Sequence, residues 1–122
     1  MVEARLKGFE TIHHSRFCYL KQLYVHKHHS YSATPNITIS MLLTERYDED
    51  DHGLRITFTD VTELQIGDLN GLVCILLDVS DVSHWGRERT RFKIQDVEYS
   101  CFSFYCDEFD FNIDINRHTG SG

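Results

Sequence analysis

The chain has 122 residues, of which 41% are hydrophobic and 25% charged, a composition typical of a globular protein and not of a disordered one. Nineteen acidic residues outnumber twelve lysines and arginines, and the net charge of -7 argues against nucleic-acid binding and favours a basic partner. No stretch reaches the roughly 20 apolar residues of a spanning helix, and the first ten lack a signal-peptide core, so we expect no membrane association and a cytoplasmic location.

The first half of the chain predicts three strands. The apolar residues of 1–15 show no sustained helical period of 3.6, so no element is assigned to this segment. Aromatic and β-branched residues predict a long strand over 16–28, and a regular alternation of apolar and polar residues predicts a second over 37–44. The acidic run within 47–53 repels itself and predicts a solvated hairpin loop, in which Gly53 is free to take a positive φ. The returning strand is expected over 54–59.

The second half predicts four or five further strands. A short strand is expected over 61–66. The almost continuously apolar residues 72–79 indicate a strand that is covered on both faces, although a buried helix would show the same pattern. Two alternating strands are expected over 90–97 and 101–105, separated from the preceding one by a loop that holds Trp85.

The last predicted strand has the clearest two-sided pattern. Four apolar residues would share one face and four polar residues the other. The apolar set is Phe109, Phe111, Ile113 and Ile115, and the polar set is Asp110, Asn112, Asp114 and Asn116.

These elements predict an all-β or β-dominated (α+β) fold. About seven strands, mostly neighbours in sequence, indicate an antiparallel meander that forms a sandwich or a partly open barrel. We expect a single domain over residues 1–118, and residues 119–122 are expected to form a flexible tail.

The cysteines predict no disulfide. Cys18, Cys74, Cys101 and Cys106 show no CxxC spacing, and buried free thiols are the simplest interpretation in a reducing compartment. If Cys101 and Cys106 share one strand, a rise of about 3.3 Å per residue separates them by roughly 17 Å, too far for a bridge.

One pair of histidines suggests a metal site. His26 and His28 would lie on one face of a strand, where a third ligand could complete a zinc site. No HExxH or Cys-His pattern accompanies them, and a strand end with solvated histidines needs no metal. We therefore expect no cofactor.

The sequence contains no motif typical of an enzyme active site. There is no GxSxG elbow, and the carboxylate of Asp107 would disfavour the thiolate of Cys106. The turn at 67–71 holds an acid where a phosphate would bind. A non-enzymatic protein is the expectation.

An acidic surface and one tryptophan are the candidate partner-binding residues. The carboxylates of Asp107, Glu108, Asp110 and Asp114 could meet basic groups of a partner, or could form a solvated face that Arg91 and Lys93 partly neutralise. Trp85 could anchor an interface or close one end of the core, and with Tyr99 and Tyr105 it could line a small-molecule pocket.

Several segments resemble small bacterial proteins of uncharacterised or immunity type. The resemblance covers roughly residues 54–115 and is carried by segments 76–81, 92–94 and 102–109 together with Trp85. Such proteins accompany polymorphic or contact-dependent toxins and neutralise them by binding. The resemblance implies a protein-binding module that could block a basic, nuclease-type toxin through surface acids.

The alternative hypothesis is a small-molecule- or metal-binding β-barrel, or an enzyme, that uses the face of His26 and His28.

Overall fold

The computed structural model describes residues 7–9, 16–28, 36–48, 53–69, 74–88, 90–98 and 100–114. Seven strands form in these residues. They are β1 (Tyr19–His28), β2 (Asn36–Thr44), β3 (Gly53–Ile66), β4 (Leu77–Asp81), β5 (Phe92–Asp96), β6 (Phe102–Cys106) and β7 (Glu108–Asp114), with one short 3-10 helix, η2 (Ser83–Trp85), between β4 and β5. The predictions for residues 1–6, 10–15 and 119–122, for Tyr99, and for Ile115 and Asn116 fall outside the described residues.

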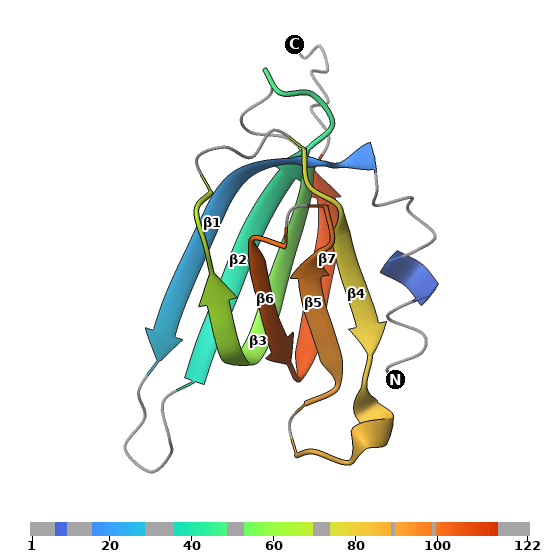
Figure 1. Ribbon diagram of the computed structural model, residues 1–122. Helices are drawn as coiled ribbons and strands as arrows, with labels where there is room; N and C mark the ends of the chain where they lie inside the picture. The colour runs from blue at the N-terminus through green and yellow to red at the C-terminus, as the bar shows by residue number, and fades with distance from the viewer. Residues whose placement is uncertain are drawn as a thin grey trace.

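The strands form an antiparallel sheet that folds into two layers (Figure 1). Its order is β1-β2-β3-β6-β5-β4, and β7 also pairs with β3. The first half of β3 lies between β2 and β7, whereas its second half pairs with β6. The β-dominated antiparallel fold is confirmed; the chain forms two meanders, β1-β2-β3 and β4-β5-β6, that meet at β3.

Two irregularities allow β3 to belong to both layers. The buried or partly buried apolar residues are spaced by two at Leu54, Ile56 and Phe58, then by three at Val61 and Leu64. Asp60 and Glu63 supply the extra residues and have positive φ angles of 57° and 53°. Such bulges bend a strand and increase its twist. The two strands expected over 54–59 and 61–66 are therefore one bent strand.

The core lies between the layers and is rich in phenylalanine. Phe109 of β7 is 1% exposed and packs edge-on against Phe92 of β5, with ring centroids 4.9 Å apart, so this contact joins the two layers. Phe9, from the described segment 7–9, covers the same ring at 5.5 Å. The alternation predicted for 109–116 is confirmed as far as it is described, because Asp110 and Asn112 are exposed while Phe111 and Ile113 pack against the core.

The sheet is not closed, but its outermost strands are linked at one point. The backbone N–H of Ile75 donates to the carbonyl of Cys18 at 2.8 Å, and Cys18 forms a disulfide with Cys74, with their Cα atoms 4.8 Å apart. The prediction of four free thiols is wrong for this pair. Cys18 and Cys74 are 56 residues apart, and only the folding of the sheet brings them together. Cys101 and Cys106 are free.

Two further expectations are corrected. Of the predicted strand 72–79, residues 77–79 belong to β4 and the described residues 74–76 do not. Leu77 and Val79 are buried but Asp78 is partly exposed, so one face of β4 is covered, not both. Gly53 does not terminate a loop with positive φ but begins β3. A Cβ atom there would lie 2.2 Å from the carbonyl oxygen of Leu43, so the close approach of β2 requires glycine.

No helix in the described part of the chain is long and apolar enough to cross a membrane.

Candidate functional site

The two free thiols are placed where they are poor nucleophiles. Burial raises the pKa of Cys106, and the nearby carboxylates of Asp107 and Asp60 raise it further. Burial and a contact with Asp96, whose Oδ2 lies 3.2 Å from the Cys101 sulfur, raise the pKa of Cys101 to about 11. Because the thiolate is the reactive form, neither thiol is activated for covalent chemistry near neutral pH.

The two strand histidines lie side by side, as their spacing predicted. The ring centroids of His26 and His28 are 4.4 Å apart at the exposed end of β1. Among the residues that the structure describes, no group of three or more His, Cys, Asp or Glu side chains could hold a metal ion. The arrangement therefore offers two imidazoles without a described third ligand.

Trp85 is held in a structured turn between β4 and β5. The carboxylate Oδ1 of Asp81 accepts hydrogen bonds from the hydroxyl of Ser83 at 2.6 Å and from its backbone N–H at 2.9 Å, and these bonds lower the pKa of Asp81. Gly86 follows with a φ of 74°, a conformation that favours glycine. The turn leaves the Trp85 side chain 47% exposed, with its ring 5.8 Å from that of Tyr105.

Two cations surround the ring of Tyr105. The guanidinium of Arg87 lies 5.3 Å from the ring centroid and also donates to Glu63 Oε2 at 2.5 Å, while Lys93 Nζ lies 5.9 Å from the same centroid. We call Trp85, Tyr105 and Arg87 the aromatic cluster. It contains the three residue types that dominate binding hot spots, on the outer face of the β4-β5-β6 layer.

The β6–β7 turn brings carboxylates next to this cluster. The backbone N–H of Asp107 donates to the carbonyl of Thr59 at 3.0 Å, which places Asp107 and Glu108 beside the bend of β3. Arg91 Nε lies 3.1 Å from Asp107 Oδ1, an ion-pair distance without hydrogen-bond alignment.

We call the four carboxylates of this region the acidic end: Asp60 and Glu63 from the bend of β3, and Asp107 and Glu108 from the turn. Figure 1 shows the bend of β3, the β6–β7 turn and η2 at the same end of the molecule. Arg87 pairs with Glu63 and Arg91 with Asp107. Within the described part of the chain, Asp60 and Glu108 form no ion pair, so two of the four carboxylates are not neutralised by a paired cation.

The structure divides the predicted acidic set. Asp107 and Glu108 lie close to the aromatic cluster, and Asp110 lies farther along β7, opposite Thr57. Asp114 pairs with Gly53 at the far end of the strand. Because a strand rises about 3.3 Å per residue, Asp114 lies about 20 Å from Glu108. Arg91 neutralises Asp107 as expected, but Lys93 contacts the ring of Tyr105.

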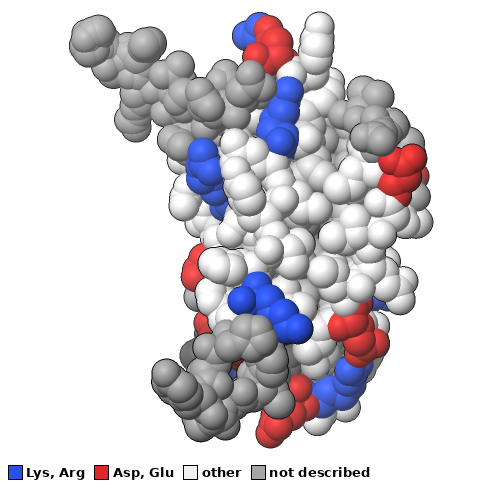
Figure 2. Space-filling view, turned by 90° about the vertical axis from the view of Figure 1, so that its left-hand side faces the viewer, with Lys and Arg blue, Asp and Glu red and all other residues white. Residues whose placement is uncertain are grey.

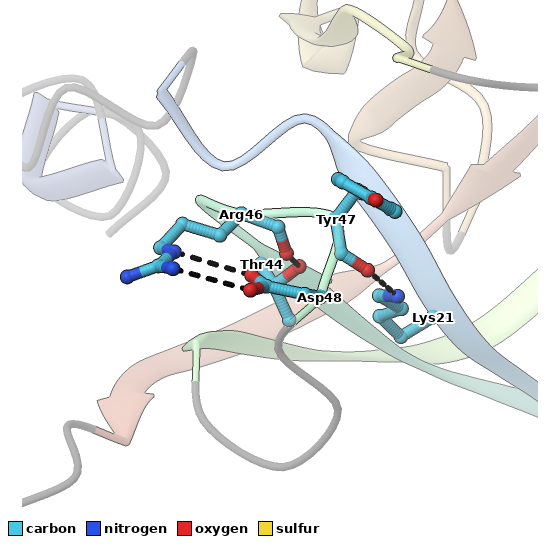
Figure 3. Close-up of polar contacts among 5 residues, drawn as sticks. All are labelled: Lys21, Thr44, Arg46, Tyr47 and Asp48. Carbon is cyan, nitrogen blue, oxygen red and sulfur yellow. Dashed lines mark hydrogen bonds and ion pairs between the residues drawn. The ribbon is translucent and has the colours of Figure 1, made fainter.

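The other acidic segment, the β2–β3 connection, lies at the opposite end of the molecule (Figure 1), and Figure 3 shows its polar contacts. Arg46 donates through Nε and Nη2 to both carboxylate oxygens of Asp48, at 3.2 and 3.1 Å, and the ammonium of Lys21 donates to the carbonyl of Tyr47. The charge of Asp48 is thus neutralised by its neighbour Arg46. Residues 49–52 of the predicted loop lie outside the described residues.

Two of the three residues of the predicted aromatic pocket, Trp85 and Tyr105, are in contact on the outer face of the sheet, and the third, Tyr99, lies outside the described residues, so the pocket stays a prediction. A shallow pocket occurs elsewhere, between the end of β3 and the start of β6. Its lining residues are Gln65, Ile66, Gly67, Ser100, Cys101, Phe102 and Ser103.

Sequence reasoning missed Asp60, Glu63 and Arg87 as members of this region. Asp60 and Glu63 lie within the two intervals, 58–61 and 61–64, in which apolar residues are three apart and not two. This spacing is a signal of bulges that was present in the sequence. The pairing of Arg87 with Glu63, 24 residues apart, had no local signal.

Comparison with known proteins identifies the family of this chain. The family model of immunity protein PIM8 matches residues 1–112. Searches of curated proteins and of solved structures found no match. The match extends the resemblance seen in the second half of the sequence to most of the chain, which therefore belongs to the immunity protein PIM8 family.

Proposed function

We propose that this protein neutralises a toxin by binding to it, without catalysis, and that the acidic end with its aromatic cluster is the docking surface. Membership of an immunity protein family supports a toxin as the partner. The observation that selects the surface is the gathering of Asp60, Glu63, Asp107 and Glu108 beside the half-exposed Trp85.

The charge of this surface suits a basic partner. Carboxylates that keep a net negative potential attract a positively charged protein and speed its association. A nuclease-type toxin fits this requirement, because its phosphate-binding surface is positive and the carboxylates can occupy the positions of phosphates. Nucleic acid itself is repelled by the net charge of -7.

The aromatic cluster supplies the apolar part of the interface. Trp85 is 47% exposed, yet its position is fixed by the Asp81–Ser83 hydrogen bonds before it and by the Tyr105 ring beneath it. A side chain that is already ordered loses little conformational entropy on binding, which favours affinity. The Arg87–Glu63 ion pair holds the rim of the same cluster in place.

The test uses the product of a toxin-like gene, which we expect to lie beside the gene for this protein. The toxin is produced with and without the protein, and both growth of the host and formation of a purified complex are measured. We expect protection and a stoichiometric complex. Trp85→Ala should weaken binding at least about tenfold, as truncation of hot-spot tryptophans does. A protein that folds but neither protects nor binds this toxin would refute the proposal.

A matched pair of variants tests the surface. Glu108→Lys reverses an exposed charge at the acidic end, and Glu98→Lys makes the same change in the exposed β5–β6 turn, at the other end of β5. Only Glu108→Lys should reduce protection. Equal effects of the two variants would mean that overall charge, not this surface, governs binding.

A further inference from the structure

The second half of β1 is exposed on both faces. Residues 24–28 are all exposed, with Tyr24 at 62% and Val25 at 48%. Among the described strands, β1 pairs only with β2, so its other edge has no partner in the part of the chain that the structure describes. An exposed edge with apolar side chains is a template for pairing with another strand.

The charge around this edge differs from that of the acidic end. None of the 19 acidic residues lies in Tyr19–His28, which carries Lys21 and Lys27. Figure 2 looks at the side of the molecule on which β1 lies, and the middle of that face is uncharged, with Lys and Arg above and below it and Asp and Glu toward its edges. A basic partner fits this edge poorly, and so the toxin proposed above is not its expected occupant.

We propose that β1 pairs with β1 of a second copy of this chain, in antiparallel register centred on Val25. The regular part of the strand is residues 22–28, since a bulge interrupts the pairing between Leu20 and Gln22. Val25 is the midpoint of this segment. A two-fold axis through that point pairs all of its residues, as an isologous interface requires.

The side chains are compatible with this register. Val25 meets its own copy on the inner face, where both are now half-exposed, and Tyr24 lies opposite His26 of the second copy on the outer face. Lys27 lies opposite Leu23, so no lysine faces a lysine. A register centred on Tyr24 would instead place Lys21 opposite Lys27.

The pairing also keeps the acidic ends apart. His28 lies at the same end of the molecule as the bend of β3, because Asn36, its partner in β2, donates to Asp60 at 3.2 Å. Antiparallel pairing of the β1 strands points the two acidic ends in opposite directions. Two copies with a charge of -7 each can therefore associate without opposing their carboxylates, and both docking surfaces remain accessible.

Sedimentation velocity across a concentration series tests the association. The wild-type protein should shift from monomer to dimer as concentration rises. Val25→Lys should weaken dimerisation about tenfold or more, because a charge that faces its own copy opposes edge pairing. Val97→Lys is the control, since Val97 is 45% exposed but lies in the β5–β6 turn. A wild-type monomer at all concentrations, or equal dimerisation of both variants, would overturn the proposal.

Disulfide trapping tests the register without relying on the Lys variants. Opposed residues of antiparallel strands have Cα atoms about 4.5–5.5 Å apart, within the range of a disulfide. Val25→Cys should therefore form a covalent dimer under mild oxidation. Lys27→Cys should not form one, because Lys27 faces Leu23 of the second copy, and residue 27 of that copy lies four residues farther along the strand, about 13 Å away. Trapping of both variants at equal rates, or of Lys27→Cys alone, contradicts the register. If Val25→Lys abolishes toxin binding while the wild type stays monomeric, β1 is a toxin surface and the dimer is refuted.

Discussion

Removing the Cys18–Cys74 bridge should reduce the stability of the fold substantially. The disulfide closes a loop between two cysteines that are 56 residues apart, and the double variant Cys18→Ser with Cys74→Ser removes this cross-link. In the chain-entropy description, a cross-link over a loop of this length restricts the unfolded chain by about 4 kcal/mol at 25 °C. The hydrogen bond from Ile75 to Cys18 remains, but a single backbone bond contributes only about 1 kcal/mol and does not compensate.

Urea unfolding followed by the fluorescence of the single tryptophan measures this loss. Cys106→Ser serves as a comparison, because it removes a free thiol and leaves the bridge intact. Titration of thiols in the denatured, unreduced protein should find the two of Cys101 and Cys106, and four after reduction. A loss below about 1 kcal/mol, or four thiols before reduction, would refute the reasoning. The cytoplasmic location stays a prediction, and the same titration on protein taken from cells would show whether the bridge persists there.

Three further results are expected. Phe109→Ala should lower the free energy of unfolding by about 3–5 kcal/mol, and Phe111→Ala by less, because only Phe109 is fully buried; urea unfolding compares them. Asp96→Ala should cost about 1–3 kcal/mol in the same assay, because the backbone N–H groups of Leu76 and Glu98 lose their acceptor. The pKa of Cys101 is raised from 9.0 in the unfolded chain to about 11 in the folded protein, so folding favours the protonated thiol. The stability that this thiol contributes is complete below pH 9.0 and is lost as the pH rises through about 11. Unfolding measured across this range should show a smaller decline for Cys101→Ser, and an identical decline would contradict the assignment.

The strands with regular alternation were predictable because one buried face imposes a period of two. The patterns at 90–97 and 109–116 located β5 and β7 to within a few residues, with Phe92, Ile94 and Phe109 buried as their positions indicated. Their partners were not predictable in the same way. β7 pairs with β3 and not with β5, because the chain leaves the meander after β6, so Asp110 lies beside Thr57 and not beside Arg91 or Lys93.

Features that depend on contacts distant in sequence escaped prediction. The disulfide, the pairing of Arg87 with Glu63 and the assembly of the acidic end all follow from the way β3 bends between the two layers. That bend had a local signature at Asp60 and Glu63, but apolar residues spaced by three can equally indicate the end of a strand. Candidate residues such as Trp85 and Glu108 could be named from their type, whereas their proximity required the fold.

The most direct test of the proposed function is the association rate of the toxin that this protein is proposed to neutralise with the wild type, Glu108→Lys and Glu98→Lys, measured at low and at high salt. We expect Glu108→Lys to slow association about tenfold at low salt, with the difference shrinking as salt screens the charges, and Glu98→Lys to have little effect. Unfolding midpoints should stay nearly unchanged, since both side chains are exposed. If all three proteins associate at the same rate at low salt, the acidic end is not the surface that meets the toxin.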